Sequence, residues 1–157
     1  MNREVTISCN IGYYNILDNL PKNIKNSEYS LYREGYNEVQ MHGYRVADMT
    51  VSIAANLGLN REEISAIRIC SIFHDIGKLY INPYILNKPS KLTDKEYNII
   101  KDHVKYSEEL LALNGYPEYS KIVLYHHEKI DGSGYYGLKG NEIPLISKII
   151  GLADVYD

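Results

Sequence analysis

The histidines and acidic side chains of this sequence lie where folding would bring them together. Each histidine lies next to a carboxylate or a second histidine, or on a helical stripe that faces inward. The tightest group is His74-Asp75-Ile76-Gly77-Lys78, which follows the apolar run Ile67–Phe73. An unpaired charge is costly to bury, and a metal ion bound by imidazole and carboxylate groups removes that cost. The sequence therefore predicts a metal site whose ligands include its five histidines, His42, His74, His103, His126 and His127.

The first half of the chain contains two helical patterns. Apolar residues recur at helical spacing over residues 36–57, which predicts a helix that Gly58 ends. Asn60-Arg61-Glu62-Glu63 has the pattern of a capping box, so a central helix is expected to begin there. Residues 82–89 contain two prolines and are expected to form a loop. Residues 1–35 are an N-terminal extension without a clear pattern, in which one or two short helices and some loop are expected.

The second half continues with further helices. A second capping box at Thr93–Glu96 begins a helix that Asn114-Gly115 ends, and Pro117 precedes another helix. The segment 131–137 is too rich in glycine for a helix or a strand, and Pro144 suits the first turn of a last helix. No segment alternates apolar and polar residues as a strand would. We therefore predict an all-α fold, a helical bundle with a metal site at its centre.

Helical spacing also predicts how the candidate ligands are arranged. Glu38 and His42 are four residues apart, so they share one face of the first helix. Adjacent residues of a helix point in different directions, so His126 and His127 are expected to serve two ions rather than one. Three side chains each follow an apolar residue by four positions and extend its inward stripe: His126, His127 and Asp154. His103 follows Ile99 by four positions and is expected on the flank of the apolar face.

The ligand types indicate which metals and which reaction to expect. Two ions roughly 3.5–4 Å apart suit displacement at phosphorus, because one activates water while the other holds phosphoryl oxygens. Imidazole and carboxylate ligands without thiolate favour iron or manganese, with zinc, cobalt or nickel as alternatives. The sequence thus predicts two or three divalent transition-metal ions.

Composition excludes several other classes of protein. The 157 residues suit one domain, and 17 basic against 20 acidic residues give a net charge of −3 without a basic stripe for a nucleic-acid polymer. No run of 18 apolar residues suggests a membrane span. Cys9 and Cys70 lie far apart and outside any CxxC pattern. Reduced thiols, and hence a cytoplasmic protein, are therefore expected.

Four motifs together resemble the HD-GYP branch of the HD-domain phosphohydrolases. They are His74–Lys78, His126-His127-Glu128, Asp131–Tyr135 and Ala153–Asp157, and the segments 85–89 and 91–93 between them also fit. The resemblance implies an all-helical catalytic domain over residues 36–157 with two or three metals, typically iron or manganese. Active members of this branch hydrolyse the bacterial second messenger cyclic di-GMP.

The resemblance also implies a role for individual residues. Glu38 would be the extra ligand of members with a third metal, although a surface glutamate has the same pattern. Lys78 would touch the scissile phosphate, or else its charge would interact with the dipole at a helix end. Glu128 would orient an imidazole or face solvent. The metal ligands would be His42, His74, Asp75, His103, His126, His127 and Asp154.

Two features depart from the family pattern. The family's Gly-Tyr-Pro reads Gly134-Tyr135-Tyr136 here, and the lost proline would have stiffened a loop that is a possible contact for a signalling protein. The chain also ends at Asp157, whereas the family continues with further helices whose basic residues hold the second phosphate of the substrate. The catalytic domain is therefore expected to be truncated at its C-terminus or to have a half-open substrate cleft.

These observations favour a metal-dependent phosphodiesterase that hydrolyses a cyclic dinucleotide with activated water. Asp75 would hold and bridge the ions, and Lys78 would neutralise charge that grows on the phosphoryl oxygens. One alternative is another HD hydrolase acting on a nucleotide or a phosphomonoester. The other is a degenerate regulatory or binding module that keeps its metals without turnover.

Overall fold

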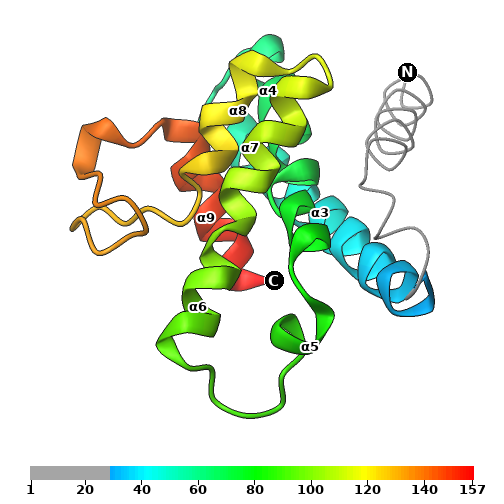
Figure 1. Ribbon diagram of the computed structural model, residues 1–157. Coiled ribbons are helices and arrows are strands. Elements are labelled where there is room, and N and C mark those ends of the chain that lie inside the picture. Colours follow the sequence, from blue (N-terminus) through cyan, green and yellow to red (C-terminus); the bar gives the residue numbers. More distant parts are fainter. Residues whose placement is uncertain (1–28) are drawn as a thin grey trace.

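The computed structural model describes residues 29–157, and within this range every regular element is a helix. The predicted all-α fold is therefore confirmed, whereas the expectations for residues 1–28, including Cys9, lie outside the described residues. In chain order the elements are α3 (Tyr29–Asn56), α4 (Arg61–Phe73), the 3-10 helix η1 (Ile76–Tyr80), α5 (Pro83–Leu86), α6 (Asp94–Lys101), α7 (His103–Leu113), α8 (Pro117–Leu124), the 3-10 helix η2 (Gly140–Glu142) and α9 (Leu145–Tyr156) (Figure 1).

Both predicted capping boxes are present. The Asn60 side chain accepts the backbone N–H of Glu63 at 3.0 Å, and the Glu63 carboxylate accepts that of Asn60 at 2.8 Å. Thr93 and Glu96 make the same exchange at the start of α6. Helix α3 begins at Tyr29 and crosses the expected border at residue 35, so the division of the chain at that point stays a prediction.

Two predicted details of the elements are wrong. The expected loop at 82–89 contains the one-turn helix α5, because the Asn82 side chain accepts the N–H of Tyr84 at 2.9 Å. The expected single helix after Thr93 is broken at Asp102, where α6 ends and α7 begins. At this break the His103 ring bonds the carbonyl oxygen of Ile100, which competes with the regular helical bonding of that oxygen.

The helices pack so that several of their ends meet at one place. Helix α3 runs along α4 and contacts α9 and η1, while α7 contacts α8 and η1 (Figure 1). Two glycines allow this close approach. A Cβ atom on Gly77 would lie 2.0 Å from the carbonyl oxygen of His103, and one on Gly151 would lie 2.3 Å from that of His126. Among residues 29–157, no helix has the length and apolarity needed to cross a bilayer.

Candidate metal centre

Three buried histidines lie at helix ends and share one arrangement. His74 follows α4, His103 begins α7, and His126 follows α8. In each ring Nδ1 faces a backbone carbonyl oxygen, which can only accept a hydrogen bond. Nδ1 therefore carries the ring's hydrogen, and Nε2 keeps a free lone pair. The Nδ1 atoms lie 2.7, 2.7 and 2.6 Å from the carbonyl oxygens three residues earlier, those of Ser71, Ile100 and Val123 respectively.

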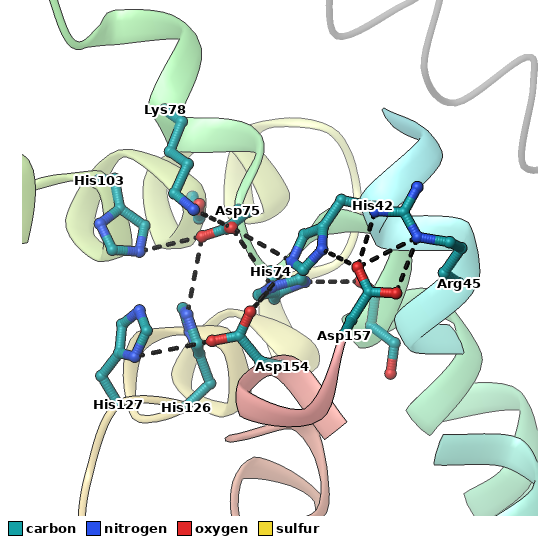
Figure 2. A network of polar contacts seen from close by, with 12 residues as sticks. His42, Arg45, His74, Asp75, Lys78, His103, His126, His127, Asp154 and Asp157 are labelled. Atoms are coloured by element: carbon teal, nitrogen blue, oxygen red, sulfur yellow. Dashed lines mark hydrogen bonds and ion pairs between the residues drawn. The ribbon is translucent and has the colours of Figure 1, made fainter. Parts of the chain in front are cut away.

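Asp75 lies at the centre of these imidazoles (Figure 2). Its Oδ1 is 3.1 Å from Nε2 of His103 and 3.8 Å from Nε2 of His126. Its Oδ2 is 3.5 Å from Nε2 of His74 and accepts a hydrogen bond from Lys78. Helix α4 ends at Phe73, and Asp75 precedes η1, so the chain changes direction at this residue. The change of direction places this carboxylate between the imidazoles.

The other side of the centre comes from α3 and α9. His42 Nε2 lies 3.0 Å from Asp154 Oδ1 and 3.6 Å from Asp75 Oδ2. Asp154 Oδ1 is 3.5 Å from His74 Nε2, and its Oδ2 is 4.0 Å from His127 Nδ1. Side chains from both ends of the described chain thus complete one cluster (Figure 2).

The cluster divides into two groups whose ligand atoms each lie within 4.8 Å of one another. Helix α8 ends at Leu124, and the rings of His126 and His127 lie in one group with their centroids 4.0 Å apart. Because His127 also lies 4.0 Å from Asp154 of the other group, service of two ions by these rings stays a prediction. Glu38 is exposed on α3 and belongs to neither group, so its role as a ligand stays a prediction. The first group is Asp75, His103, His126 and His127, and the second is His42, His74, Asp75 and Asp154.

Buried polar atoms in this cluster suit a bound metal. Nε2 of three histidines and Oδ1 of Asp75 are buried without a hydrogen-bond partner among the described residues. Such atoms are rare in folded proteins because each loses its hydration without compensation. Imidazole nitrogens and carboxylate oxygens are ligands of divalent transition metals. The residues therefore fit a metal centre, and the three histidines are His74, His103 and His126.

The electrostatics favour the metal-binding form of His126, His127 and Asp75. Burial lowers the pKa of His127 to about 4 and the pKa of His126 well below 6.5, so both rings are neutral near pH 7. Burial opposes ionisation of Asp75, but His74, His103 and Lys78 outweigh it and hold the carboxyl pKa well below 3.8. His42 differs, because its hydrogen bond to Asp154 raises the pKa of the ring and so favours the protonated form. Neutral imidazoles and ionised carboxylates are the forms that bind metals.

Two contributing residues were missed by sequence reasoning. Asp157 accepts a hydrogen bond from Nδ1 of His42 at 2.8 Å and also binds the Arg45 guanidinium, with contacts of 2.7 Å. Arg45 follows His42 by one helical turn, and Asp157 follows Asp154 in the same way, so their spacing was a usable signal. The pair fixes the ring orientation of His42.

Neither role expected for Glu128 is observed. Its carboxylate is buried and accepts the backbone N–H groups of Tyr136 at 2.6 Å and Leu138 at 2.7 Å. Glu128 therefore holds the segment 131–137 rather than an imidazole. The signal was present in the sequence, since a glycine-rich segment leaves backbone N–H groups that need acceptors.

Comparison with known proteins agrees with this geometry. The HD domain family matches residues 39–157. The chain is 38% identical over 130 residues to the cyclic di-GMP phosphodiesterase response regulator RpfG of Xanthomonas campestris pv. campestris, covering 80% of this chain and 34% of that protein. It is also 38% identical to the 3'3'-cGAMP-specific phosphodiesterase 3 of Vibrio cholerae, over 74% of this chain and 26% of that protein.

A solved structure shares the fold. Bd1817, an HDG"Y"P protein from Bdellovibrio bacteriovorus, superposes with a TM-score of 0.63 at 20% sequence identity. The match covers 74% of this chain and 39% of that one. The chain thus spans about a third of RpfG and less than half of each of the other two proteins.

This chain belongs to the HD-domain family, since the family match covers most of the described helices and all the candidate histidine ligands. Within that family it falls in the HD-GYP branch, as its motifs predicted. The His74-Asp75 pair that gives the family its name lies at the centre of the cluster (Figure 2).

Proposed function

We propose that this chain is a metal-dependent phosphodiesterase that hydrolyses a cyclic dinucleotide, with cyclic di-GMP as the first candidate substrate. The observation that carries the proposal is the pair of ligand groups that share Asp75. Two adjacent sites of imidazole and carboxylate suit displacement at phosphorus. The names of RpfG and of the Vibrio cholerae relative, which specify cyclic di-GMP and 3'3'-cGAMP, support a cyclic dinucleotide as the substrate.

The proposed ligands are those of the two groups, with Asp75 shared, and Glu38 is kept as a ligand for a third ion. Ions bound there would activate water and polarise the phosphoryl oxygens. The chain itself supplies ionised carboxylates and imidazoles whose Nδ1 atoms are fixed by backbone carbonyls. Iron or manganese is the proposed metal, because the ligands are nitrogen and oxygen atoms without thiolate.

Lys78 is the proposed phosphate contact. Its ammonium group bonds Asp75, while 28% of its side chain remains exposed. An ammonium group has three N–H donors, so Lys78 can bond Asp75 and a phosphoryl oxygen together. Placed beside the reacting phosphorus, it would stabilise the negative charge that develops in the transition state.

The test compares substrates on the manganese-loaded full chain. Cyclic di-GMP, 3'3'-cGAMP and p-nitrophenyl phosphate are incubated separately, and the products are separated by chromatography. We expect opening of the cyclic dinucleotides and little hydrolysis of the monoester. Faster hydrolysis of the monoester would favour another HD hydrolase. Full metal occupancy without turnover of any substrate would favour a regulatory module.

A signalling partner and a cytoplasmic location belong to the same proposal. Tyr136 is 43% exposed on the segment that Glu128 holds, which supports a protein contact through Gly134-Tyr135-Tyr136. Cys70 is a buried free thiol, which supports a reducing compartment.

A further inference from the structure

A polar cavity of about 260 Å³ lies beside the metal centre. It is formed between the junction of α6 and α7 and the segment 131–137. We name it the lysine–tyrosine pocket after its most numerous side chains. Its lining residues are Asn98, Lys101, Asp102, Lys105, Tyr135 and Tyr136.

Tyr135 connects this pocket to the candidate ligands. Its ring centroid is 4.7 Å from that of His127 and 6.4 Å from that of His103. The Lys101 ammonium lies 5.0 Å from the centroid of the same tyrosine ring. One aromatic ring therefore borders both the metal centre and the pocket. A molecule whose phosphate binds at the centre can place a neighbouring group in the pocket.

The side of the pocket that Tyr135 and Tyr136 form is fixed by contacts within the protein. The Glu128 carboxylate accepts hydrogen bonds from the N–H groups of Tyr136 and Leu138, which fixes the backbone that follows Tyr135. A Cβ atom on Gly134 would lie 2.5 Å from the Cα atom of Glu128, so the two backbones are in direct contact. The ring of Tyr135 is thus supported by a packed segment, which reduces the entropy lost when a ligand stacks on it.

The polar groups of the pocket complement a guanine base. Guanine presents the acceptors N7 and O6, which lysine binds, and the donors N1–H and N2–H₂, which a carboxylate accepts. Lys105 bonds Asp102 at 2.8 Å, and the carboxylate keeps lone pairs for further donors. Adenine presents an amino group in place of O6 and lacks the N1–H group. Because adenine keeps N7, the ammonium group of Lys101 would keep that acceptor but would face an amino donor in place of O6, and Asp102 would lose the N1–H donor.

We propose that the lysine–tyrosine pocket binds a guanine base of the substrate and makes the site prefer guanine to adenine. The inference rests on the proposed function, because the phosphate at the metal centre is what brings the base to the pocket. Tyr135 provides a stacking surface, Lys101 binds the O6 and N7 edge, and Asp102 accepts from N1–H and N2–H₂. This assigns base specificity to the junction of α6 and α7.

The experiment measures nucleotide binding without relying on catalysis. GMP and AMP are titrated by calorimetry into the manganese-loaded full chain. We expect GMP to bind about tenfold or more tightly than AMP, the scale of one good base contact. Lys101→Met and Asp102→Asn should each remove most of this preference. Tyr135→Leu should weaken both nucleotides, and Tyr135→Phe, which keeps the ring, should restore them.

A matched control is Lys95→Met, an exposed lysine on α6 outside the pocket, which should leave both affinities unchanged. Equal binding of GMP and AMP to the native chain would overturn the inference and requires no variant. Preference for GMP that survives both Lys101→Met and Asp102→Asn would also overturn it. A GMP preference without hydrolysis of any cyclic dinucleotide would retain the pocket while rejecting the proposed function.

Discussion

The two sides of the candidate metal centre are held in different ways. On the inner side, His74, His103 and His126 are buried, and each donates a hydrogen bond to a carbonyl oxygen of the helix that precedes it. On the outer side, His42 is oriented by Asp157, a side chain 115 positions away. The inner imidazoles are thus fixed by local backbone, whereas the outer one requires α9 to be docked against α3. Substitutions of side chains that orient an imidazole should therefore affect the outer side selectively.

The largest effect in this series is expected on the inner side at Lys78. Lys78→Ala should slow phosphodiester hydrolysis by roughly 10²–10³-fold while the metals remain bound, because one transition-state charge contact is lost. Steady-state kinetics and metal analysis of the same preparation check this. Lys91→Ala, at an exposed position, is the control and should retain native rates. Full activity of Lys78→Ala would reduce its role to a charge partner of Asp75.

The next effect isolates the outer side. Asp157→Asn should weaken metal affinity or activity by roughly 10–100-fold, the range for partners that orient a ligand. The cause is a loosened His42 ring, since the amide replaces a charged acceptor that also binds Arg45. Metal titration measures the affinity. Arg45→Ala should act in the same direction, and no change in either variant would mean that His42 needs no support from α9.

A substitution where α9 packs against the backbone of His126 should lower the stability of the fold. A Cβ atom at Gly151 would meet the backbone oxygen of His126 at 2.3 Å, so Gly151→Ala must push α9 away. Such overpacking typically costs about 1–3 kcal/mol. Denaturant unfolding should show this loss, together with weaker metal binding through Asp154. Gly35→Ala is the control, since its Cβ would meet nothing within 4 Å, and native-like stability of Gly151→Ala would contradict the tight packing.

The smallest effect concerns a pair away from the centre. Lys88, together with the N–H and hydroxyl groups of Thr93, lowers the pKa of Glu96 from 4.5 to about 2. A lowered folded-state pKa means stability that is present above pH 4.5 and is lost as the pH falls through about 2. The stability difference between the native chain and Glu96→Gln should shrink over that window in unfolding experiments. A difference that does not change with pH would show that the ion pair contributes nothing.

Sequence reasoning succeeded where the signal was local. The boxes at Asn60 and Thr93 located two helix starts, because each uses residues only three positions apart. Sequence reasoning failed to predict where helices end beside the metal-ligand cluster. At the breaks beside His74, His103 and His126, each ring bonds a carbonyl oxygen of the preceding helix and faces a shared carboxylate, and helical periodicity does not encode these contacts.

Long-range contacts explain the remaining omissions. The ion pair of Arg45 and Asp157 spans 112 positions, and only the packing of α9 on α3 brings the two residues together. The role of Glu128 likewise depends on a turn that returns residues 136 and 138 to its carboxylate. The residue types were visible in the sequence, whereas their partners required the fold.

The most direct test of the account is the metal content of the full chain and of its Asp75→Ala variant, because Asp75 is shared by both ligand groups. Protein prepared without chelator is checked for folding by circular dichroism and then measured by elemental analysis. The two groups predict at least two equivalents of a divalent transition metal per native chain and loss of both in Asp75→Ala, with Asp48→Ala, an exposed aspartate on α3, unchanged. Less than about one equivalent in a folded native chain, or full occupancy in Asp75→Ala, would contradict a shared two-metal centre.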